Sequence, residues 1–563
     1  MTRLPRTRSI AGVSSSAPSR WRTRLNVLTG EGRWRALLAT GAVVGLGVYC
    51  CCATPIPSET IPVTSTESPD APAEDQAEPE VANLEATADE EPPLLPVLNE
   101  EALTARLAAQ QSLLGKDLFE DAQGKPIPWI TPQDEIPVDG ADGKGPSTAD
   151  DTLLDSLPGS SGLGGSDGAT TGRVINGNAL GLFVPIEAPP GGESPLSNFY
   201  AALEDLRAGN DPDGKVRVLV YGGSHTDADV YTQYLRRYLQ QRFGDGGHGF
   251  VHVAKPWRWY RHVDYRVEGA KYWKTEHAQR RSGRMDGLYG LMGCSLAAKN
   301  KRAFGKVIPR GESVGAEYDL LFLRQPKGGS FKLLADGKVI KTIKTRADAF
   351  EAGHHRFTLP EGQHEIELDL LGNGEVRVFG MTIEREQPGV VIDTLGIGGT
   401  RAANMLKWNE EIWADNVKAR DPNLVVMFYG TNEATDADQP IRVYERDLRA
   451  VLTKISTMAP QASCLLMGPG DFPRKDEEGV WHNRQRIDDI IDVQRRVAAE
   501  HGCGFWDTKA FMGGELSMTR WAAAQPPMAK QDHIHFTKRG YVRIGMALVD
   551  AMMVEFDGGS LTD

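Results

Sequence analysis

The stretch VRVLVYGGSHTDADVYTQYLRRYL, residues 216–239, decides the fold class. It begins with a short β-branched run that ends in glycines, and it continues into residues with helical periodicity. A buried strand that leads directly into a helix is the repeating unit of an α/β domain. The stretch therefore predicts the first strand and helix of such a domain, with Ser224 at their junction.

Similar apolar runs recur downstream at residues 390–395, 424–429 and 464–467. Each run closes at or near a glycine, and most are followed by helical periodicity. This alternation predicts a parallel sheet with helices on both faces. In such a sheet the reacting groups gather at the carboxyl ends of the strands.

The alternation is interrupted at residues 315–386, where the helical signal disappears. Two-residue alternation and turn dipeptides take its place, in the segments EYDLLFLR, SFKLLA, KVIKTIKT, HHRFTLP, HEIELDL and EVRVFGMTIER. This pattern predicts a small antiparallel β-sandwich inserted between the first two strands of the parallel sheet. We expect the insert to position a substrate or bind carbohydrate; a purely structural insert is the alternative.

The N-terminal region, residues 1–53, carries eight arginines and one glutamate. It ends in an apolar run, residues 36–53, of about the length needed to cross a bilayer. Positive charge before that run predicts that the rest of the chain is exported. Cys50, Cys51 and Cys52 leave three outcomes open: lipidation as a lipoprotein after cleavage, an uncleaved membrane anchor, or cleavage of a signal peptide. We expect a location in the cell envelope, anchored to a membrane and facing the periplasm or the outside.

Residues 54–170 form an acidic, Pro-rich linker with 24 acidic and four basic residues. Such a composition is typical of disordered segments. The remainder of the chain has no net charge and no basic stripe, which argues against nucleic acid as a partner. Cys294, Cys464 and Cys503 are too few and too scattered to predict a disulfide framework or a zinc site.

Four motifs that carry polar chemistry follow the predicted elements in a fixed order. Ser224 follows the first strand, although Ser224 with Asp227 also resembles a helix-capping box. GIGGTR, residues 396–401, contains Gly399, and FYGTNEA, residues 428–434, contains Asn432. DHIHFTKRGY, residues 532–541, places Asp532 and His535 three residues apart, a spacing that lets a carboxylate orient an imidazole. Together these residue types supply a nucleophile, oxyanion donors, a base and its orienting acid.

With these four blocks the chain resembles the SGNH (GDSL-like) hydrolase superfamily, over about residues 195–557 without the insert. The resemblance implies a flavodoxin-like three-layer hydrolase domain in two parts, residues 190–314 and 387–557. It further implies a triad of Ser224, His535 and Asp532. The implied oxyanion hole consists of Ser224, Gly399 and Asn432. Gly223 departs from the family pattern, because an aspartate usually precedes the nucleophile.

The expected function is a serine esterase that hydrolyses acyl esters, with acetyl esters of a cell-envelope or extracellular polysaccharide as the substrate class. The inserted β-sandwich and supporting motifs resemble bacterial polysaccharide and peptidoglycan O-acetylesterases. No metal or organic cofactor is implied. Two alternatives remain: an O-acyltransferase of the same fold and a non-catalytic polysaccharide-binding relative.

Overall fold

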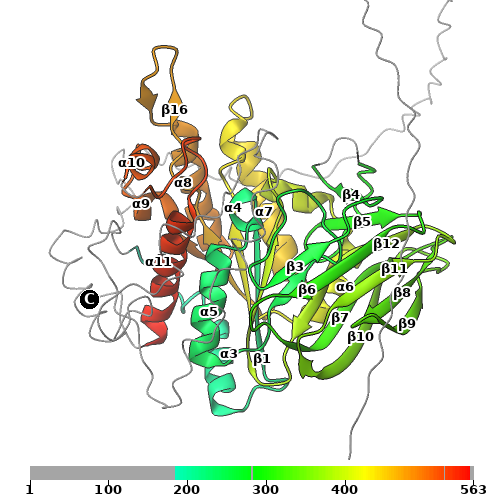
Figure 1. Ribbon diagram of the computed structural model, residues 1–563. Coiled ribbons are helices and arrows are strands. Elements are labelled where there is room, and N and C mark those ends of the chain that lie inside the picture. The colour runs from blue at the N-terminus through cyan, green and yellow to red at the C-terminus, as the bar shows by residue number, and fades with distance from the viewer. Residues whose placement is uncertain (1–183, 190, 280–282, 525–526, 558–563) are drawn as a thin grey trace, which may run out of the picture. The chain divides into compact units, whose positions relative to one another are not determined.

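The computed structural model describes residues 184–189, 191–279, 283–524 and 527–557 (Figure 1). The predicted anchor segment, residues 1–53, and the predicted linker, residues 54–170, lie outside the described residues. Among the helices that are described, none is both long enough and apolar enough to span a membrane.

A five-stranded parallel sheet forms the centre of the α/β domain, in the order β13-β1-β14-β15-β18. This is the flavodoxin-like order, in which the first strand lies between the second and the third. The predicted flavodoxin-like parallel sheet is therefore confirmed. The strands are β1 (Lys215–Gly222), β13 (Gly389–Gly396), β14 (Leu424–Phe428), β15 (Ser463–Met467) and β18 (Gly504–Trp506).

Helices cover both faces of this sheet because alternate residues of each strand point to opposite sides. In β1, Val218 and Val220 belong to one core cluster, and Leu219 and Tyr221 belong to another. The first core includes α3, α5 and α11, which lie side by side in Figure 1. The second includes α6, α7 and α8. The longer helices are α3 (Ser197–Ala208), α5 (Tyr231–Phe243), α6 (Glu410–Arg420), α7 (Ile441–Met458), α8 (Gln485–Glu500) and α11 (Lys538–Phe556).

Short elements complete the α/β domain, most of them near the carboxyl ends of the strands. A two-stranded hairpin, β16 and β17, projects from the loop after β15 (Figure 1). These elements are α4 (Ser224–Asp227), η4 (Ala402–Lys407), η5 (Glu433–Thr435), β16 (Arg474–Lys475), β17 (Trp481–His482), α9 (Thr508–Met512) and α10 (Ser517–Ala523).

Two antiparallel sheets, here called the antiparallel module, lie in the chain between α5 and β13 and enclose a core of their own. One sheet has the order β10-β7-β12-β5-β4, with β2 also paired to β12, and the other has the order β3-β6-β11-β8-β9. The predicted inserted antiparallel sheets are therefore present. The strands are β2 (Gly249–Val251), β3 (Tyr265–Glu268), β4 (Lys274–His277), β5 (Cys294–Ala298), β6 (Phe304–Pro309), β7 (Gly315–Arg324), β8 (Ser330–Ala335), β9 (Lys338–Lys344), β10 (Glu351–Gly362), β11 (Ile366–Leu370) and β12 (Val376–Glu384).

The module begins earlier in the chain than residues 315–386, where the sequence pattern placed it. The strands β2 to β6 come before residue 315, in the part assigned to the hydrolase domain, and they pair with later strands of the module. Four of these five strands have only three to five residues each, so their alternation is too short to stand out from the connecting loops.

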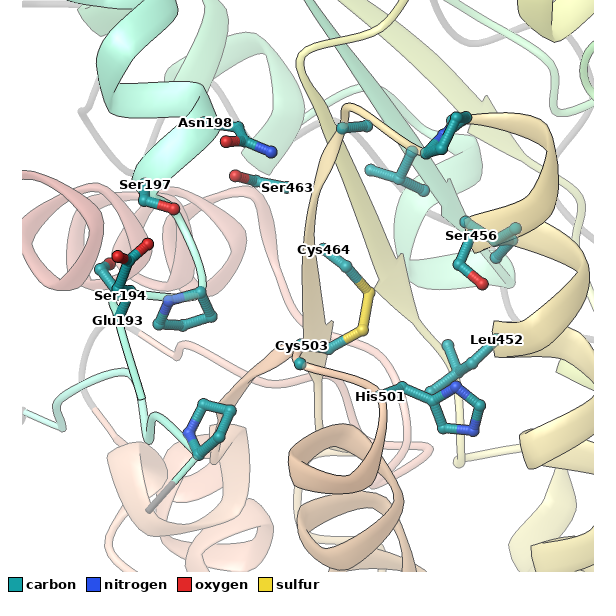
Figure 2. Close-up of a pocket in the computed structure, with 18 of the residues that line it drawn as sticks. Glu193, Ser194, Ser197, Asn198, Leu452, Ser456, Ser463, Cys464, His501 and Cys503 are labelled. Carbon is teal, nitrogen blue, oxygen red and sulfur yellow. A yellow bond between two sulfur atoms is a disulfide. The ribbon is translucent and has the colours of Figure 1, made fainter. Parts of the chain in front are cut away.

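Cys464 and Cys503 form a disulfide, although the number and spacing of the downstream cysteines did not predict one. Cys464 lies in β15 and Cys503 directly precedes β18, and these two strands are neighbours in the sheet. Figure 2 shows the disulfide in the wall of a hollow of about 380 Å³. Because this hollow adjoins the amino ends of β15 and β18, it lies at the sheet edge opposite the predicted site.

Replacing both Cys464 and Cys503 with serine should lower the free energy of unfolding by roughly 4 kcal/mol, because the bond closes a loop of 39 residues. Urea unfolding of the oxidised protein, the reduced protein and the double variant measures this difference. Equal stability of the oxidised and reduced proteins would contradict the prediction. The matched control is Cys294→Ser, which removes a buried thiol that forms no disulfide.

Candidate active site

Three neighbouring strands carry the predicted site residues to one edge of the sheet. β1 ends at Gly222, two residues before Ser224, and it pairs in parallel with β13 and β14. Gly399 follows the end of β13, and Asn432 follows the end of β14. Since carboxyl ends of parallel strands share one edge, the Ser, Gly and Asn blocks meet there.

The fourth block reaches the same place from the loop before α11. His535 Nε2 lies 2.8 Å from Ser224 Oγ, and His535 Nδ1 lies 2.8 Å from Asp532 Oδ2. The His535 side chain is buried, while the Ser224 side chain remains partly exposed. A hydroxyl, an imidazole and a carboxylate are thus joined in one hydrogen-bonded chain, which is the arrangement of a nucleophile, base and orienting acid.

The loop that carries Asp532 and His535 is fixed by its own hydrogen bonds. The backbone N–H groups of Ile534 and His535 both donate to Asp532 Oδ1, at 2.9 Å each. Burial raises the pKa of Asp532, but the hydrogen bonds from the His535 ring and from these N–H groups outweigh it and leave the pKa well below its usual range. Asp532 is therefore ionised at neutral pH, as an acid that orients an imidazole must be.

Asn432 lies between the first and second blocks. Its Nδ2 donates to the Thr400 carbonyl at 2.9 Å, and a Cβ added to Gly223 would lie 3.0 Å from the same nitrogen. Gly223 therefore allows Asn432 to approach the nucleophile loop closely. A side chain at this position would require the Asn432 amide to shift by a few tenths of an ångström.

Backbone N–H groups remain free beside this amide. Gly399 has a φ of +77°, which an L side chain rarely adopts. Within the described residues, no hydrogen bond forms from the backbone N–H of Gly399 or of Ser224. These two groups and the second N–H of the Asn432 amide are donors that an oxyanion could accept from.

Glu433, which no sequence motif pointed to, holds together the two loops that carry Gly399 and Asn432. Its buried carboxylate accepts from the backbone N–H of Ala402 at 2.9 Å and of Gly430 at 3.0 Å. It thereby ties the loop after β13 to the loop after β14. Burial raises the pKa of Glu433. The signal was available in the sequence, because a glutamate directly follows Asn432 in FYGTNEA.

Asp227 also has a hydrogen-bond partner that the sequence did not predict. Both of its carboxylate oxygens accept from Trp257 Nε1, at 3.0 and 3.1 Å, so it does not serve as the partner in a capping box with Ser224. Burial raises the pKa of Asp227 to about 7, although the Trp257 hydrogen bond lowers it. Trp257 lies in the loop between β2 and β3, so this contact joins the antiparallel module to the helix that begins at Ser224.

Two other histidines lie near the residues of the predicted triad and have different surroundings. His225 is buried, stacks on Phe428 and lies 3.1 Å from the Tyr541 hydroxyl through Nδ1. Burial, together with the charge of His535, lowers the pKa of His225 to about 3, so His225 is neutral. His533 donates from Nδ1 to the Gln531 carbonyl, and its ring lies 4.1 Å from the ring of Trp481 at a tilt of 34°. Only His535 reaches Ser224 among the histidines that the structure describes.

Asp229, His248 and His262 form a buried cluster whose ligand-type atoms all lie within 4.8 Å of one another. Arg236 is buried beside them and donates to both oxygens of Asp229. A buried guanidinium repels a cation, and His248 and His262 hydrogen-bond each other at 2.9 Å. The cluster is therefore a hydrogen-bond network between α5 and the module, and its surroundings are poorly suited to binding a metal ion.

The comparison with protein families agrees with this geometry. Residues 369–543 match the model of the GDSL-like Lipase/Acylhydrolase family. The match contains Gly399, Asn432, Asp532 and His535, whereas Ser224 precedes it because the antiparallel module separates the first block from the others. The resemblance to SGNH hydrolases is therefore confirmed, and the class that the fold and this match define is a carboxylic ester hydrolase.

Solved structures extend the likeness beyond the matched segment. A peptidoglycan O-acetylesterase has 22% sequence identity and a TM-score of 0.55, and the alignment covers 67% of this chain and 99% of that chain. An acetyl xylan esterase has 18% identity and a TM-score of 0.22, covering 29% of this chain and 80% of its own. A family two carbohydrate esterase from Clostridium thermocellum has 10% identity and a TM-score of 0.22, covering 47% and 96%. No curated protein matches the sequence. The first likeness shows that nearly the whole fold of that esterase is present here.

Proposed function

We propose that the protein is a serine esterase in which Ser224 is the nucleophile, His535 the general base and Asp532 the acid that orients it. The observation that supports this is the unbroken hydrogen-bonded chain from Ser224 through His535 to Asp532. Ser224 Oγ attacks the ester carbonyl while its proton passes to His535 Nε2. The alcohol leaves with that proton, and water then attacks the acyl-serine with His535 again as base.

The negative charge that develops on the carbonyl oxygen is expected to meet three donors. These are the backbone N–H of Ser224, the backbone N–H of Gly399 and the side-chain amide of Asn432. Because the donors are held before the reaction begins, they stabilise the transition state without reorganisation. The hydrogen bond from Asn432 to the Thr400 carbonyl and the carboxylate of Glu433 hold two of them in place.

Asn432→Ala should lower kcat by about 100- to 1,000-fold, because one oxyanion donor contributes ~2.7–4 kcal/mol to transition-state stabilisation. KM for a small ester should change little, since the donor acts on charge that develops only in the transition state. The measurement is p-nitrophenol release from p-nitrophenyl acetate over a range of concentrations. Turnover equal to that of the unaltered protein would remove Asn432 from the oxyanion hole.

The substrate class that we propose is an acetylated polysaccharide of the cell envelope. Two considerations support it: the likeness to a structure that is described as a peptidoglycan O-acetylesterase, and the composition of residues 54–170, which predicts a linker. A flexible linker of this length would reach ~5–6 Å times the square root of its residue number, or some tens of ångströms. Such reach suits a hydrolase that acts on an immobile polymer.

We also propose that the folded part works outside the cytoplasm, held to a membrane through residues 36–53 or through a lipid on one of the adjacent cysteines. The Cys464–Cys503 disulfide supports export, because disulfides persist in oxidising compartments and are rare in the cytosol. Fractionation of cells that produce the full chain tests this, with an Arg→Gln series in residues 1–35 as the comparison. Recovery of the full chain from the cytosol, with both cysteines reduced, would contradict it.

The test of the activity compares free acetate with p-nitrophenol after incubation of the protein with p-nitrophenyl acetate, with and without a soluble oligosaccharide. A hydrolase releases the two products in equal amounts under both conditions. If added oligosaccharide removes free acetate while p-nitrophenol release continues, the protein transfers the acyl group and is not primarily a hydrolase. Sugar binding without release of either product would identify a non-catalytic relative.

A further inference from the structure

The antiparallel module extends a side chain into the proposed active site. Gln279 follows β4, the edge strand of one module sheet, and its Nε2 lies 3.1 Å from the position that a Cβ on Gly399 would occupy. Gly399 has no side chain, so the carboxamide of Gln279 covers the face of the glycine that a side chain would otherwise fill. A residue of the module thus borders the proposed oxyanion hole.

Further contacts make this approach a fixed feature of the fold. Trp257 donates to Asp227, and a Cβ on Gly398 would lie 3.6 Å from Asp227 Oδ2. The ring of His277, the last residue of β4, lies 6.4 Å from the ring of Trp257. The edge of the module therefore rests against both the helix after Ser224 and the glycine loop.

The carboxamide of Gln279 has no hydrogen-bond partner among the residues that the structure describes. Its oxygen is shielded from solvent and accepts no hydrogen bond, and no donation from its nitrogen is seen. A buried amide oxygen without a partner costs free energy, because it has lost its hydrogen bonds to water and gained none from the protein. A ligand that paired with this amide would recover that free energy on binding.

We propose that Gln279 is a specificity-determining residue, which hydrogen-bonds a polar oxygen of the sugar ring that carries the scissile acetyl ester. This inference rests on the proposed esterase function and adds the group that the site recognises. Because Gln279 Nε2 lies beside the position of a Cβ on Gly399, a substrate whose carbonyl oxygen binds the Gly399 N–H would bring the atoms that flank this carbonyl close to the carboxamide. The module is then part of the substrate site, and a small ester without a sugar does not use this contact.

The test uses the full chain with Gln279→Met, which keeps the length of the side chain and removes its hydrogen bonds. The two probes are O-acetylated chitotetraose and p-nitrophenyl acetate. We expect the ratio of kcat/KM for the sugar ester to that for p-nitrophenyl acetate to fall about tenfold, mainly through a higher KM for the sugar ester. Gln279→Glu should keep more of the sugar affinity, because its carboxylate still accepts from hydroxyls, while its charge beside the oxyanion hole lowers kcat for both probes.

Lys274→Met is the matched control, because Lys274 is an exposed residue of β4, the strand that Gln279 follows, and its ion pair is with Glu276. Its ratio should equal that of the unaltered protein. A Gln279→Met variant in which kcat falls equally for both probes would make Gln279 a support of the oxyanion hole and overturn the proposal. An unchanged ratio would overturn it as well.

Two results would contradict the proposed esterase function itself. The unaltered protein would show no turnover, or its turnover would be unaffected by Ser224→Ala. In that event, calorimetric binding of acetylated chitotetraose to the full chain still decides the role of Gln279. Affinity about tenfold weaker in Gln279→Met supports the contact, and equal affinity excludes it. Melting temperatures of all variants exclude loss of the fold as the cause.

Discussion

Ser224→Ala is expected to lower esterase activity by roughly 10⁴-fold or more. The activity that remains would come from direct attack of water on the ester, assisted by the other oxyanion donors. The reason is that Ser224 Oγ is the side-chain oxygen that His535 Nε2 contacts, at 2.8 Å. The measurement is p-nitrophenol release from p-nitrophenyl acetate under substrate saturation. Binding of the ester should persist, because the substitution removes one oxygen at a partly exposed position.

Ser456→Ala is the matched control for this variant, since Ser456 is an exposed residue of α7 that bonds only within its own helix. It should retain full activity. Should Ser224→Ala and Ser456→Ala be equally active, the nucleophile would have to be another group. The hydrogen-bonded chain to Asp532 would then have a purely structural role.

Asp532→Asn is expected to lower kcat by about 10⁴-fold with little loss of stability. The two backbone N–H groups that donate to Asp532 Oδ1 would hold the oxygen of the new amide at that position. Its NH₂ group would then face His535 Nδ1 and donate to it. The imidazole would carry its own proton on Nε2, where it could no longer accept the proton of Ser224.

The control for Asp532→Asn is Asp438→Asn, the same change at an exposed carboxylate outside the site. Both variants should melt within a few degrees of the unaltered protein, which separates a wrong tautomer from unfolding. Activity of Asp532→Asn within tenfold of the unaltered protein would contradict the orienting role of Asp532.

The sequence was sufficient to predict the parallel sheet and the meeting of the four motifs at one edge of it. Each strand of the sheet except β18 corresponds to a short apolar run that ends near a glycine. Such a run can be identified from neighbouring residues alone. The order of the strands makes the ends of β13, β1 and β14 neighbours, so residues that follow those runs must meet. For the same reason the predicted site residues come together although Ser224 and His535 lie more than 300 positions apart.

Features that depend on contacts between distant elements could not be predicted. The pairing of Cys464 with Cys503 follows from β15 and β18 being adjacent, which the spacing of the cysteines does not reveal. The contacts of Trp257 with Asp227 and of Gln279 with Gly399 require the docking of the module on the hydrolase domain. No pattern within either segment specifies that docking.

The insertion of the antiparallel module also has a consequence for how the chain folds. β1 and β13 pair from Lys215↔Gly389 to Gly222↔Gly396, so about 170 residues separate the partners. Closing so long a loop is slow when the intervening chain is unstructured. A module that has already folded, with α5 and β2 leading into it and β12 leading out, brings the ends of β1 and β13 together. Refolding should therefore show formation of the module first and recovery of the esterase site as a later, slower phase.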